Sequence, residues 1–245
     1  TFDFIEDPRH FRFPLFGLYC NPDELIINTE KKISLYEWKL KNKFCCIVVS
    51  NPNAKERIEF YTELSKYKTI DSGGKWNNNV EIGPSHIDKL NFIRNYKFVI
   101  SFENSSYPGY TTEKIIEPLM INSIPIYWGN PLIEKDINLG RIINVHSYDS
   151  INDVIQEIIA IDNDDLLALE IVNAPIFNNN KIPDQINKSE MLKFLIKAVE
   201  NNNMPVGQSI FGKMSIVICK ILLWCRRMKN GLKHYWIIES NTKKS

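Results

Sequence analysis

The stretch YKFVISFENSSYPGYTTEKIIEPLMINSIPIYWGNP, residues 96–131, decides the fold of this chain. It opens with residues 97–102, a short apolar run rich in β-branched and aromatic side chains, which is typical of a buried strand. After a polar loop, a helical pattern begins near residues 111–114 and stops near Asn122. Residues 124–128 form a second apolar run. This order predicts a right-handed βαβ unit whose ligand side lies beyond the carboxyl ends of the strands.

The start of the predicted helix has an unusual charge pattern. Thr111 or Thr112 can cap it, and Glu113 suits the positive end of the helix dipole. Lys114 does not suit that end, because a cation in the first turn is unfavourable. The cost disappears if the ammonium contacts an anion, such as a phosphate, that the free backbone amides hold. A solvated lysine beside a glutamate is the alternative, and the charge pattern alone leaves both open.

Three elements of this stretch resemble the donor-binding signature of the α1,3/4-fucosyltransferases, glycosyltransferase family ten. That family carries a Phe-Glu-Asn element, a Tyr-x-Thr-Glu-Lys element and a closing Ile/Val-Pro-Ile/Val strand that ends near a glycine. Here the three elements occupy residues 102–104, 110–114 and 124–129, in the family's order and at its spacing. The resemblance implies an α/β fold: a Rossmann-like parallel sheet with helices on both faces, the donor-binding half of a GT-B type glycosyltransferase.

The resemblance also implies a site for the donor, GDP-fucose. Lys114 is expected to hold the diphosphate, Glu113 to bond hydroxyl groups of fucose or ribose, and Tyr110 to contact the donor. We name no catalytic base in this chain. Glu103 and its neighbour Asn104 are weaker donor-binding candidates, and Glu103, at a strand end, is expected instead to tie down the loop that carries Tyr110.

A second basic contact is expected in the polar loop of residues 72–79. Its two glycines let a backbone approach a ligand closely, although a plain turn is the alternative. Family members use a basic residue at or near this loop to hold the diphosphate. One familiar version has arginine where this chain has Asn77, so Lys75 is expected to replace it. Asn51 is a further weak candidate that serves equally well as a turn residue.

Composition describes an ordinary globular protein. The 245 residues suit one large domain or somewhat more, and 44% apolar residues suffice for a sizeable core. A net charge of +1 gives no strong overall field, so nucleic acid is not an expected partner.

The cysteines and acidic residues do not indicate a metal site. Five cysteines lack metal-ligand spacing, and their odd number fits a reducing compartment. Cys45 and Cys46 read as small buried hydrophobes. Residues 162–165, Asp-Asn-Asp-Asp, read as a turn and helix cap, because no strand delivers these carboxylates to the ligand edge. We therefore expect no metal and no cofactor besides the donor substrate.

The remaining pattern completes the predicted domain. Strands are expected at 44–50, 69–71 and 142–145, and helices at 54–67, 85–95, 151–161, 166–172 and 189–200. In two of these helices, the predicted packing sides are Ile58, Tyr61, Leu64 and Ser65, and Ile87, Leu90, Ile93 and Arg94. Pro118 predicts a kink or a later start for the central helix. His146 is expected to be a satisfied structural histidine rather than a ligand contact.

The expected domain organisation has three parts. Residues 1–42 resemble the family's segment between its two halves, residues 43–200 form the Rossmann-like GDP-fucose-binding domain, and residues 201–245 are a linker and a basic amphipathic tail. In the family an acceptor-side domain comes before this segment. The chain is therefore expected to be the donor half plus a tail, with the general base in the missing half.

Within the tail, residues 210–229 combine short apolar runs with basic residues and a tryptophan. The runs are too short to span a bilayer, so the segment fits either a membrane surface or packing on its own domain. The expected location is the cytoplasm, either free or at the membrane surface. A location in the lumen of the Golgi is the alternative, because the chain is expected to lack its N-terminal part.

Two classes of function follow from the resemblance. The first is inverting transfer of L-fucose from GDP-fucose to a glycan acceptor that contains N-acetylglucosamine, through an α1,3 or α1,4 linkage. The second is a non-catalytic nucleotide-sugar-binding fragment that retains the donor site without the acceptor half.

Overall fold

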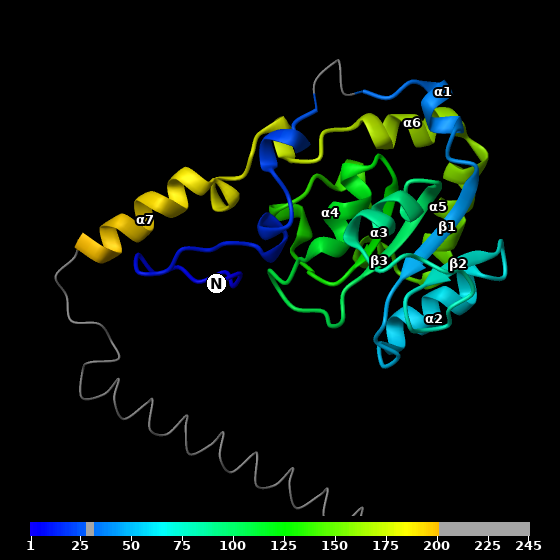
Figure 1. The fold of residues 1–245 in the computed structure, drawn as a ribbon, viewed down its shortest axis with the longest axis horizontal. Helices are drawn as coiled ribbons and strands as arrows, with labels where there is room; N and C mark the ends of the chain where they lie inside the picture. The colour runs from blue at the N-terminus through cyan, green and yellow to red at the C-terminus, as the bar shows by residue number, and fades with distance from the viewer. Residues whose placement is uncertain (28–31, 201–245) are drawn as a thin grey trace, which may run out of the picture. The chain divides into compact units, whose positions relative to one another are not determined.

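The computed structural model describes residues 1–27 and 32–200 (Figure 1). Contacts divide the chain into two units, residues 1–195 and residues 196–245. The predicted linker and the amphipathic segment 210–229 lie outside the described residues. In the part of the chain that is described, no helix is both long and apolar enough to cross a membrane.

The centre of the first unit is a sheet of five parallel strands. The strands are β1 (Lys43–Val48), β2 (Ile70–Gly73), β3 (Tyr96–Phe102), β4 (Ile124–Trp128) and β5 (Ile143–Asn144). Their order across the sheet is β2-β1-β3-β4-β5. The direction of winding therefore reverses between β1 and β3, and in such sheets ligands bind at this switch point, beyond the carboxyl ends of the strands.

Seven α-helices accompany the sheet within residues 1–27 and 32–200. They are α1 (Leu35–Lys39), α2 (Lys55–Leu64), α3 (His86–Ile93), α4 (Glu113–Met120), α5 (Ile151–Asn163), α6 (Asp165–Asn173) and α7 (Lys188–Glu200). Short 3-10 turns lie at Leu15–Leu18, Pro22–Leu25, Ile133–Lys135, Leu139–Arg141, Val145–Ser147, Asn178–Asn180 and Asp184–Ile186. Local capping explains several helix starts: the Ser85 side chain caps α3 and the Ser150 side chain caps α5.

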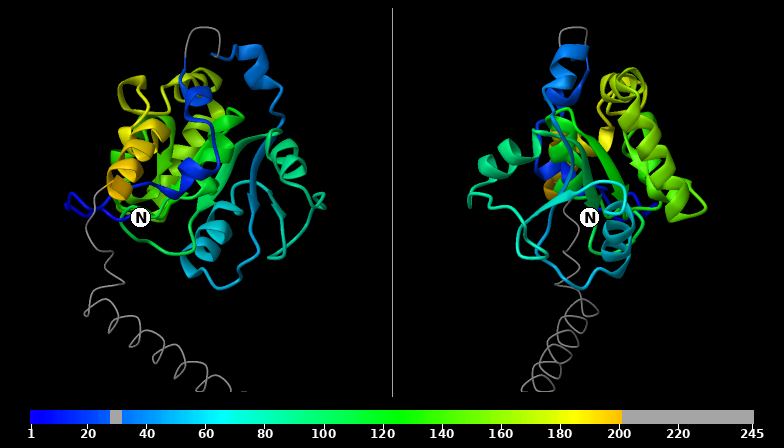
Figure 2. Two further views of the ribbon diagram at one scale, coloured as in Figure 1. Left: turned by 60° about the vertical axis from the view of Figure 1, so that its left-hand side comes forward. Right: turned by 90° about the vertical axis from the view of Figure 1, so that its right-hand side faces the viewer.

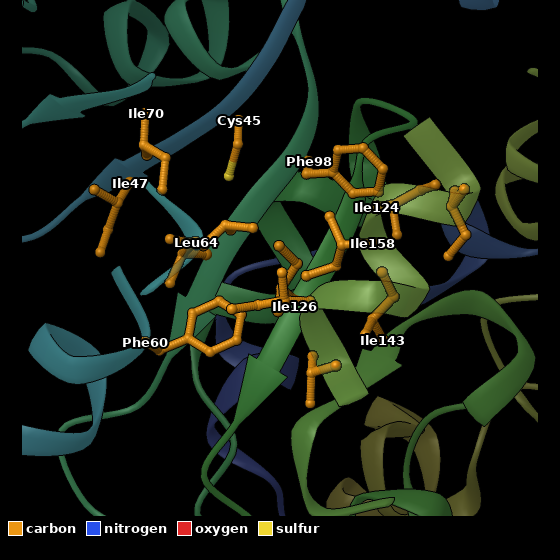
Figure 3. Packing of buried hydrophobic residues seen from close by; sticks show 14 of the residues in the cluster. Cys45, Ile47, Phe60, Leu64, Ile70, Phe98, Ile124, Ile126, Ile143 and Ile158 are labelled. Carbon is orange, nitrogen blue, oxygen red and sulfur yellow. The ribbon is translucent and has the colours of Figure 1, made fainter. Parts of the chain in front are cut away.

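Both faces of the sheet are covered, as predicted. On one face, side chains of α2, α5 and α6 pack against strand residues of one large cluster, which includes Ile47, Phe98 and Ile126 (Figure 3). On the other face, residues of α3 and α4 pack in two smaller clusters. The right-hand view of Figure 2 shows the sheet between α3, in teal, and α5 and α6, in yellow-green. Cys45 and Cys46 are buried in clusters on opposite faces, which confirms their predicted role as small buried hydrophobes.

The packing sides of two helices were predicted in part. Helix α2 buries Leu64, and Tyr61 packs partly buried against the core, as predicted, but Arg57 and Phe60 are buried as well and were not predicted.

In α3 the side chain of Ile87 is 67% exposed, Arg94 is exposed as well, and Ile93 carries the packing. Helical spacing constrains which residues share a face, but the tertiary fold decides which face meets the sheet. The helix α4 starts at Glu113, so Pro118 does not mark a later start. The helix ends two residues after this proline.

Candidate functional site

The carboxylate of Glu103 organises the carboxyl end of β3. Its side chain is fully buried, and it accepts hydrogen bonds from the backbone N–H of Thr112 at 2.8 Å and from the Thr112 hydroxyl at 2.8 and 3.0 Å. Gly129 lies against it: a Cβ atom there would be 2.5 Å from Cγ of Glu103, so only glycine fits. Glu103 was predicted to tie down the loop around Tyr110. The structure shows that it holds the start of α4, two residues farther along the chain.

Lys114 turns back onto this buried carboxylate. Its ammonium lies 3.3 Å from Oε2 of Glu103, 3.1 Å from Oε1 of Glu113 and 3.1 Å from Oγ1 of Thr112. Burial opposes the charge, but the two carboxylates outweigh it, so the pKa of the Lys114 ammonium is raised. For Glu103 burial dominates and the carboxyl pKa is raised, whereas for Glu113 the neighbouring lysine outweighs burial and the pKa is lowered. The site therefore holds a cation at the first turn of α4, between two acids.

A small groove with a volume of about 20 Å³ lies beside this lysine at the switch point. It is lined by Val48 and Val49 of the β1 end, Val99 and Ile100 of β3, Lys89 and Ile93 of α3, and Lys114, Glu117 and Pro118 of α4. The buried carboxylate of Glu117 pairs with His86 and Lys89. The cation of Lys114 is thus placed where a parallel sheet of this order binds its ligands.

Arg57 joins the loops that follow β1 and β3. Its buried guanidinium nitrogen Nη2 lies 2.8 Å from the carbonyl oxygen of Phe102, 3.0 Å from that of Glu103 and 3.1 Å from Oδ1 of Asn104, and its Nη1 donates to the Asn51 carbonyl at 3.4 Å. Two of the weaker predicted donor contacts therefore have partners within the chain. The Asn51 side chain also accepts from the backbone N–H of Asn53 at 2.9 Å, so its predicted role as a turn residue is confirmed.

The two glycines of the loop after β2 serve packing within the chain. A Cβ at Gly73 would lie 2.0 Å from the Ile82 side chain, and one at Gly74, where φ is +86°, would lie 2.3 Å from the carbonyl oxygen of Val49. The same carbonyl accepts from the backbone N–H of Lys75 at 3.1 Å. The glycines are thus needed for packing against Ile82 and the end of β1, and the expected approach of a ligand to this loop stays a prediction.

The side chains of this loop are differently placed from those of α4. Lys75 and Asn77 are exposed, and the φ of Asn77 is +46°, in the left-handed region that asparagine tolerates. Within the described chain, the ammonium of Lys75 has neither a hydrogen bond nor an ion pair. The structure therefore brings Glu103, Glu113 and Lys114 together, and it leaves Lys75 and Asn77 on a separate loop at the same edge of the sheet.

Tyr110 lies in the loop that leads into α4. Its ring meets the Phe2 ring edge-on at 5.7 Å, and its carbonyl oxygen accepts from the Tyr127 hydroxyl at 3.4 Å. His146 stacks on Trp128 at 5.8 Å, with its Nε2 3.4 Å from the Gly129 carbonyl oxygen, which supports the expected structural role of this histidine.

The acidic run of residues 162–165 forms a helix cap, as predicted. Asp164 accepts from the backbone N–H groups of Leu166 and Leu167 at the start of α6. Within residues 1–27 and 32–200, no group of three or more His, Cys, Asp or Glu side chains is arranged to hold a metal ion.

Sequence reasoning missed two residues that shape the site. Arg57 lies within the predicted helix of residues 54–67, and its burial was not predicted. Asn130 follows the predicted strand of residues 124–128, and it is fully buried and bonds Gly109 and Thr111 of the loop before α4. A polar side chain directly after a buried strand was the available signal, but the sequence does not show which loop it meets.

Comparisons with known proteins agree with this geometry. The family model described as glycosyltransferase family 10 (fucosyltransferase), C-terminal region, matches residues 38–170. The chain is 40% identical over 119 residues to an α-(1,3)-fucosyltransferase of Helicobacter pylori, covering 49% of this chain and 24% of that protein. It is 31% identical over 144 residues to the bovine 4-galactosyl-N-acetylglucosaminide 3-α-L-fucosyltransferase 9, covering 57% of this chain and 39% of that protein.

A solved structure shows the same fold. The crystal structure of an α1,3-fucosyltransferase with GDP-fucose matches with a TM-score of 0.66 and 27% identity, over 83% of this chain and 70% of that one. This likeness confirms the predicted fold class, an α/β fold of the GT-B type found in α1,3-fucosyltransferases. The chain spans about a quarter of the length of the Helicobacter protein.

Proposed function

This chain belongs to glycosyltransferase family 10, the fucosyltransferases, and on that premise we propose that it is the donor-binding part of an enzyme that transfers L-fucose from GDP-fucose to a glycan. The observation that carries the proposal is the placement of Lys114. Its ammonium lies at the first turn of α4, it lines the groove at the switch point, and two carboxylates keep it charged.

The chemistry requires positive charge at the leaving group. As the bond between the fucose anomeric carbon and the diphosphate oxygen breaks, the sugar gains oxocarbenium character and negative charge grows on the departing diphosphate. Lys114 and the positive end of α4 would stabilise that charge. Because these groups supply the positive charge, we propose that the donor binds without a metal ion.

The remaining donor contacts follow from the positions of the side chains. Glu113 is half-buried beside Lys114 and is proposed to bond a sugar hydroxyl, and Tyr110 is proposed to contact the donor from the preceding loop. Lys75 and Asn77 follow β2, and their exposed side chains are proposed to reach the diphosphate from that side. Asn51 and Asn104, which Arg57 binds, are proposed to shape the site rather than contact the donor.

The acceptor is proposed by analogy with a relative, and the general base that activates it is proposed by excluding Glu103. The bovine relative is named for transfer to a galactosyl-N-acetylglucosaminide, and an acceptor containing N-acetylglucosamine is proposed here by analogy. Glu103 is an unsuitable general base, because its carboxylate is fully buried and already bonded to Thr112 and Lys114. We therefore place the base that deprotonates the acceptor elsewhere in the whole protein.

Isothermal calorimetry with GDP-fucose tests the donor site. Wild type, Lys114→Met, Lys75→Met and the control Lys66→Met, an exposed lysine on the surface, would be titrated with GDP-fucose, with GDP-mannose as competitor and with EDTA present. A lost charge-assisted bond weakens binding by about 10- to 100-fold, so Lys114→Met should show a loss of this size and Lys66→Met none. Wild-type affinity for Lys75→Met would remove that residue from the site.

Folding must be separated from binding in this test. Lys114→Met leaves the Glu103 carboxylate buried without its cation, so the double variant Glu103→Gln/Lys114→Met, which buries no unpaired charge, is the matched comparison. Weak binding by both variants, with cooperative unfolding retained, supports the proposal. Absence of binding by folded wild type at millimolar GDP-fucose would overturn it.

A further inference from the structure

The N-terminal segment packs on the loop that leads into α4. The backbone N–H of Phe16 donates to the carbonyl oxygen of Thr111 at 3.0 Å. The ring of Phe2 meets Tyr110 at 5.7 Å and Tyr107 at 6.1 Å, edge-on in both cases. This loop is therefore covered on one side by residues that lie far earlier in the chain, at its N-terminal end.

Asn130 is the link between this loop and the turn after β4. Its fully buried amide accepts from the backbone N–H of Gly109 at 2.8 Å and donates to the Thr111 hydroxyl at 3.1 Å. The same amide nitrogen lies 3.4 Å from Oδ2 of Asp136. One side chain thus holds a backbone N–H and a side-chain hydroxyl of the loop, and it lies beside a carboxylate that can orient it.

Arg12 in turn holds that carboxylate. Its guanidinium makes two parallel bonds of 2.7 Å to the two oxygens of Asp136, whose side chain is fully buried. Its Nε donates to the Phe2 carbonyl at 3.0 Å, and the ring of Phe4 lies 3.9 Å from the guanidinium carbon. A planar fork of this kind fixes both direction and distance, which a lysine does not.

The loop is therefore held from two sides. On the inner side, Glu103 binds Thr112, and on the outer side Asn130 binds Gly109 and Thr111. The four residues 109–112, which carry these anchors, include Tyr110 and lead directly into the first turn of the helix. Any movement of the outer anchor would shift the segment that presents the donor-binding side chains.

We propose that Arg12 and Asp136 are positioning residues of the donor site: acting through Asn130, they hold residues 109–112 in the conformation that binds a nucleoside diphosphate sugar. This inference rests on the proposed function of the site. It assigns a role in donor binding to a residue of the N-terminal segment that lies outside the groove beside Lys114.

Hydrogen exchange of the free protein, followed by mass spectrometry, is the primary test. The contacts that run from Arg12 through Asp136 to Asn130 are called the relay below. The variant Arg12→Met/Asp136→Leu removes the relay without leaving a buried charge unpaired, a replacement that proteins commonly tolerate. Its matched control is Asp7→Leu/Arg9→Met, an exposed pair of the same residue types in the same segment. Peptides covering residues 105–112 would be compared with peptides of β3 and β4.

The expected result is local to the loop. In the relay variant, amides of residues 105–112 should exchange about tenfold faster while those of β3 and β4 keep their wild-type rates, and calorimetry should show about tenfold weaker GDP-fucose binding. The control pair should match wild type in both measurements. Faster exchange confined to residues 1–16, with wild-type affinity, would mean that the pair only anchors the N-terminal segment, and this would overturn the proposal.

A second variant keeps the proposal testable if Arg12→Met/Asp136→Leu does not fold. Arg12→Lys keeps the charge opposite Asp136 but loses the fork and the bond to the Phe2 carbonyl, so it should show the same loop-specific change to a smaller extent. Wild-type exchange in Arg12→Lys would overturn the proposal if the double variant does not fold. Because exchange is measured without donor, it shows whether Arg12 and Asp136 hold the loop even if wild type fails to bind GDP-fucose. Such a failure to bind would count against the proposed function alone.

Discussion

Two lysines show how neighbouring groups set the pKa of an ammonium group that is shielded from water. Lys114 sits between two carboxylates, and its pKa is raised. Lys41 is 6% exposed, and among the described residues its ammonium donates to the Arg94 carbonyl at 2.7 Å and the Ser123 hydroxyl at 3.1 Å. Burial, together with the nearby guanidinium groups of Arg94 and Arg141, lowers the pKa of the Lys41 ammonium to about 7.

This difference predicts a pH dependence of stability that belongs to Lys41. Between the folded pKa of about 7 and the ordinary value of 10.5, the unfolded chain binds a proton that the folded chain lacks, so stability rises with pH. From about pH 7 to about pH 8.5 the free energy of unfolding should rise by about 1.5 kcal/mol through this residue. Urea unfolding at both pH values would measure it.

The variant Lys41→Met should lack that rise, whereas Lys66→Met, which changes an exposed lysine, should keep it. An equal rise in Lys41→Met and wild type would show that the ammonium is not the source. The comparison ends at about pH 8.5 because burial raises the thiol pKa values of Cys45 and Cys46. The folded chain thus retains thiol protons that the unfolded chain loses at higher pH, which would lower stability there.

At the scale of elements, Arg57 connects α2 to the ends of two neighbouring strands. Its guanidinium reaches the carbonyl oxygens of Phe102 and Glu103, which end β3, and that of Asn51, which follows β1. The two loops that border the switch point are thereby held by one side chain. Such a clamp is needed because loops beyond the strand ends lack the ladder of hydrogen bonds that holds the strands themselves.

Removing this clamp should destabilise the domain. Arg57→Met deletes the hydrogen bonds of a buried guanidinium, and we expect a loss of about 2–4 kcal/mol in the free energy of unfolding, measured by urea denaturation. Arg9→Met, at a side chain that is 84% exposed, is the control and should change stability by less than about 0.5 kcal/mol. If the two variants were equally stable, the buried contacts would contribute nothing net.

At the scale of the whole molecule, the proposed donor site depends on the assembled sheet. Lys114, Glu103 and the lining of the groove come from β1, β3, α3 and α4, which meet only in the folded chain. Binding of a donor must therefore favour the folded state over the unfolded one.

This linkage predicts a shift in global stability. At a GDP-fucose concentration about 100 times its Kd, the free energy of unfolding of wild type should rise by about 2.7 kcal/mol. Lys114→Met at the same concentration should rise far less, because its Kd is larger. The check is chemical denaturation with and without the donor. Binding seen by calorimetry without any such rise would show that the donor does not need the fold described here.

Much of the local structure was predictable from local sequence. The strand Ile124–Trp128 has its predicted bounds, and Ser85 and the acidic run before α6 cap the helices as expected. Apolar runs and capping side chains act over a few residues, so the sequence shows them directly. The charge pattern at Glu113 and Lys114 was visible for the same reason.

The sequence by itself determined the parallel α/β fold, the family and the segment that carries the candidate site. Only the tertiary structure decided which partners its side chains meet: Glu103 with Lys114 across the loop before α4, Gly74 with the end of β1, and Arg12 with Asp136 across 124 positions. The physical reason is the distance along the chain over which each interaction acts. Propensity and capping are local, whereas the desolvation that drives ion pairing and burial depends on what the rest of the chain brings nearby.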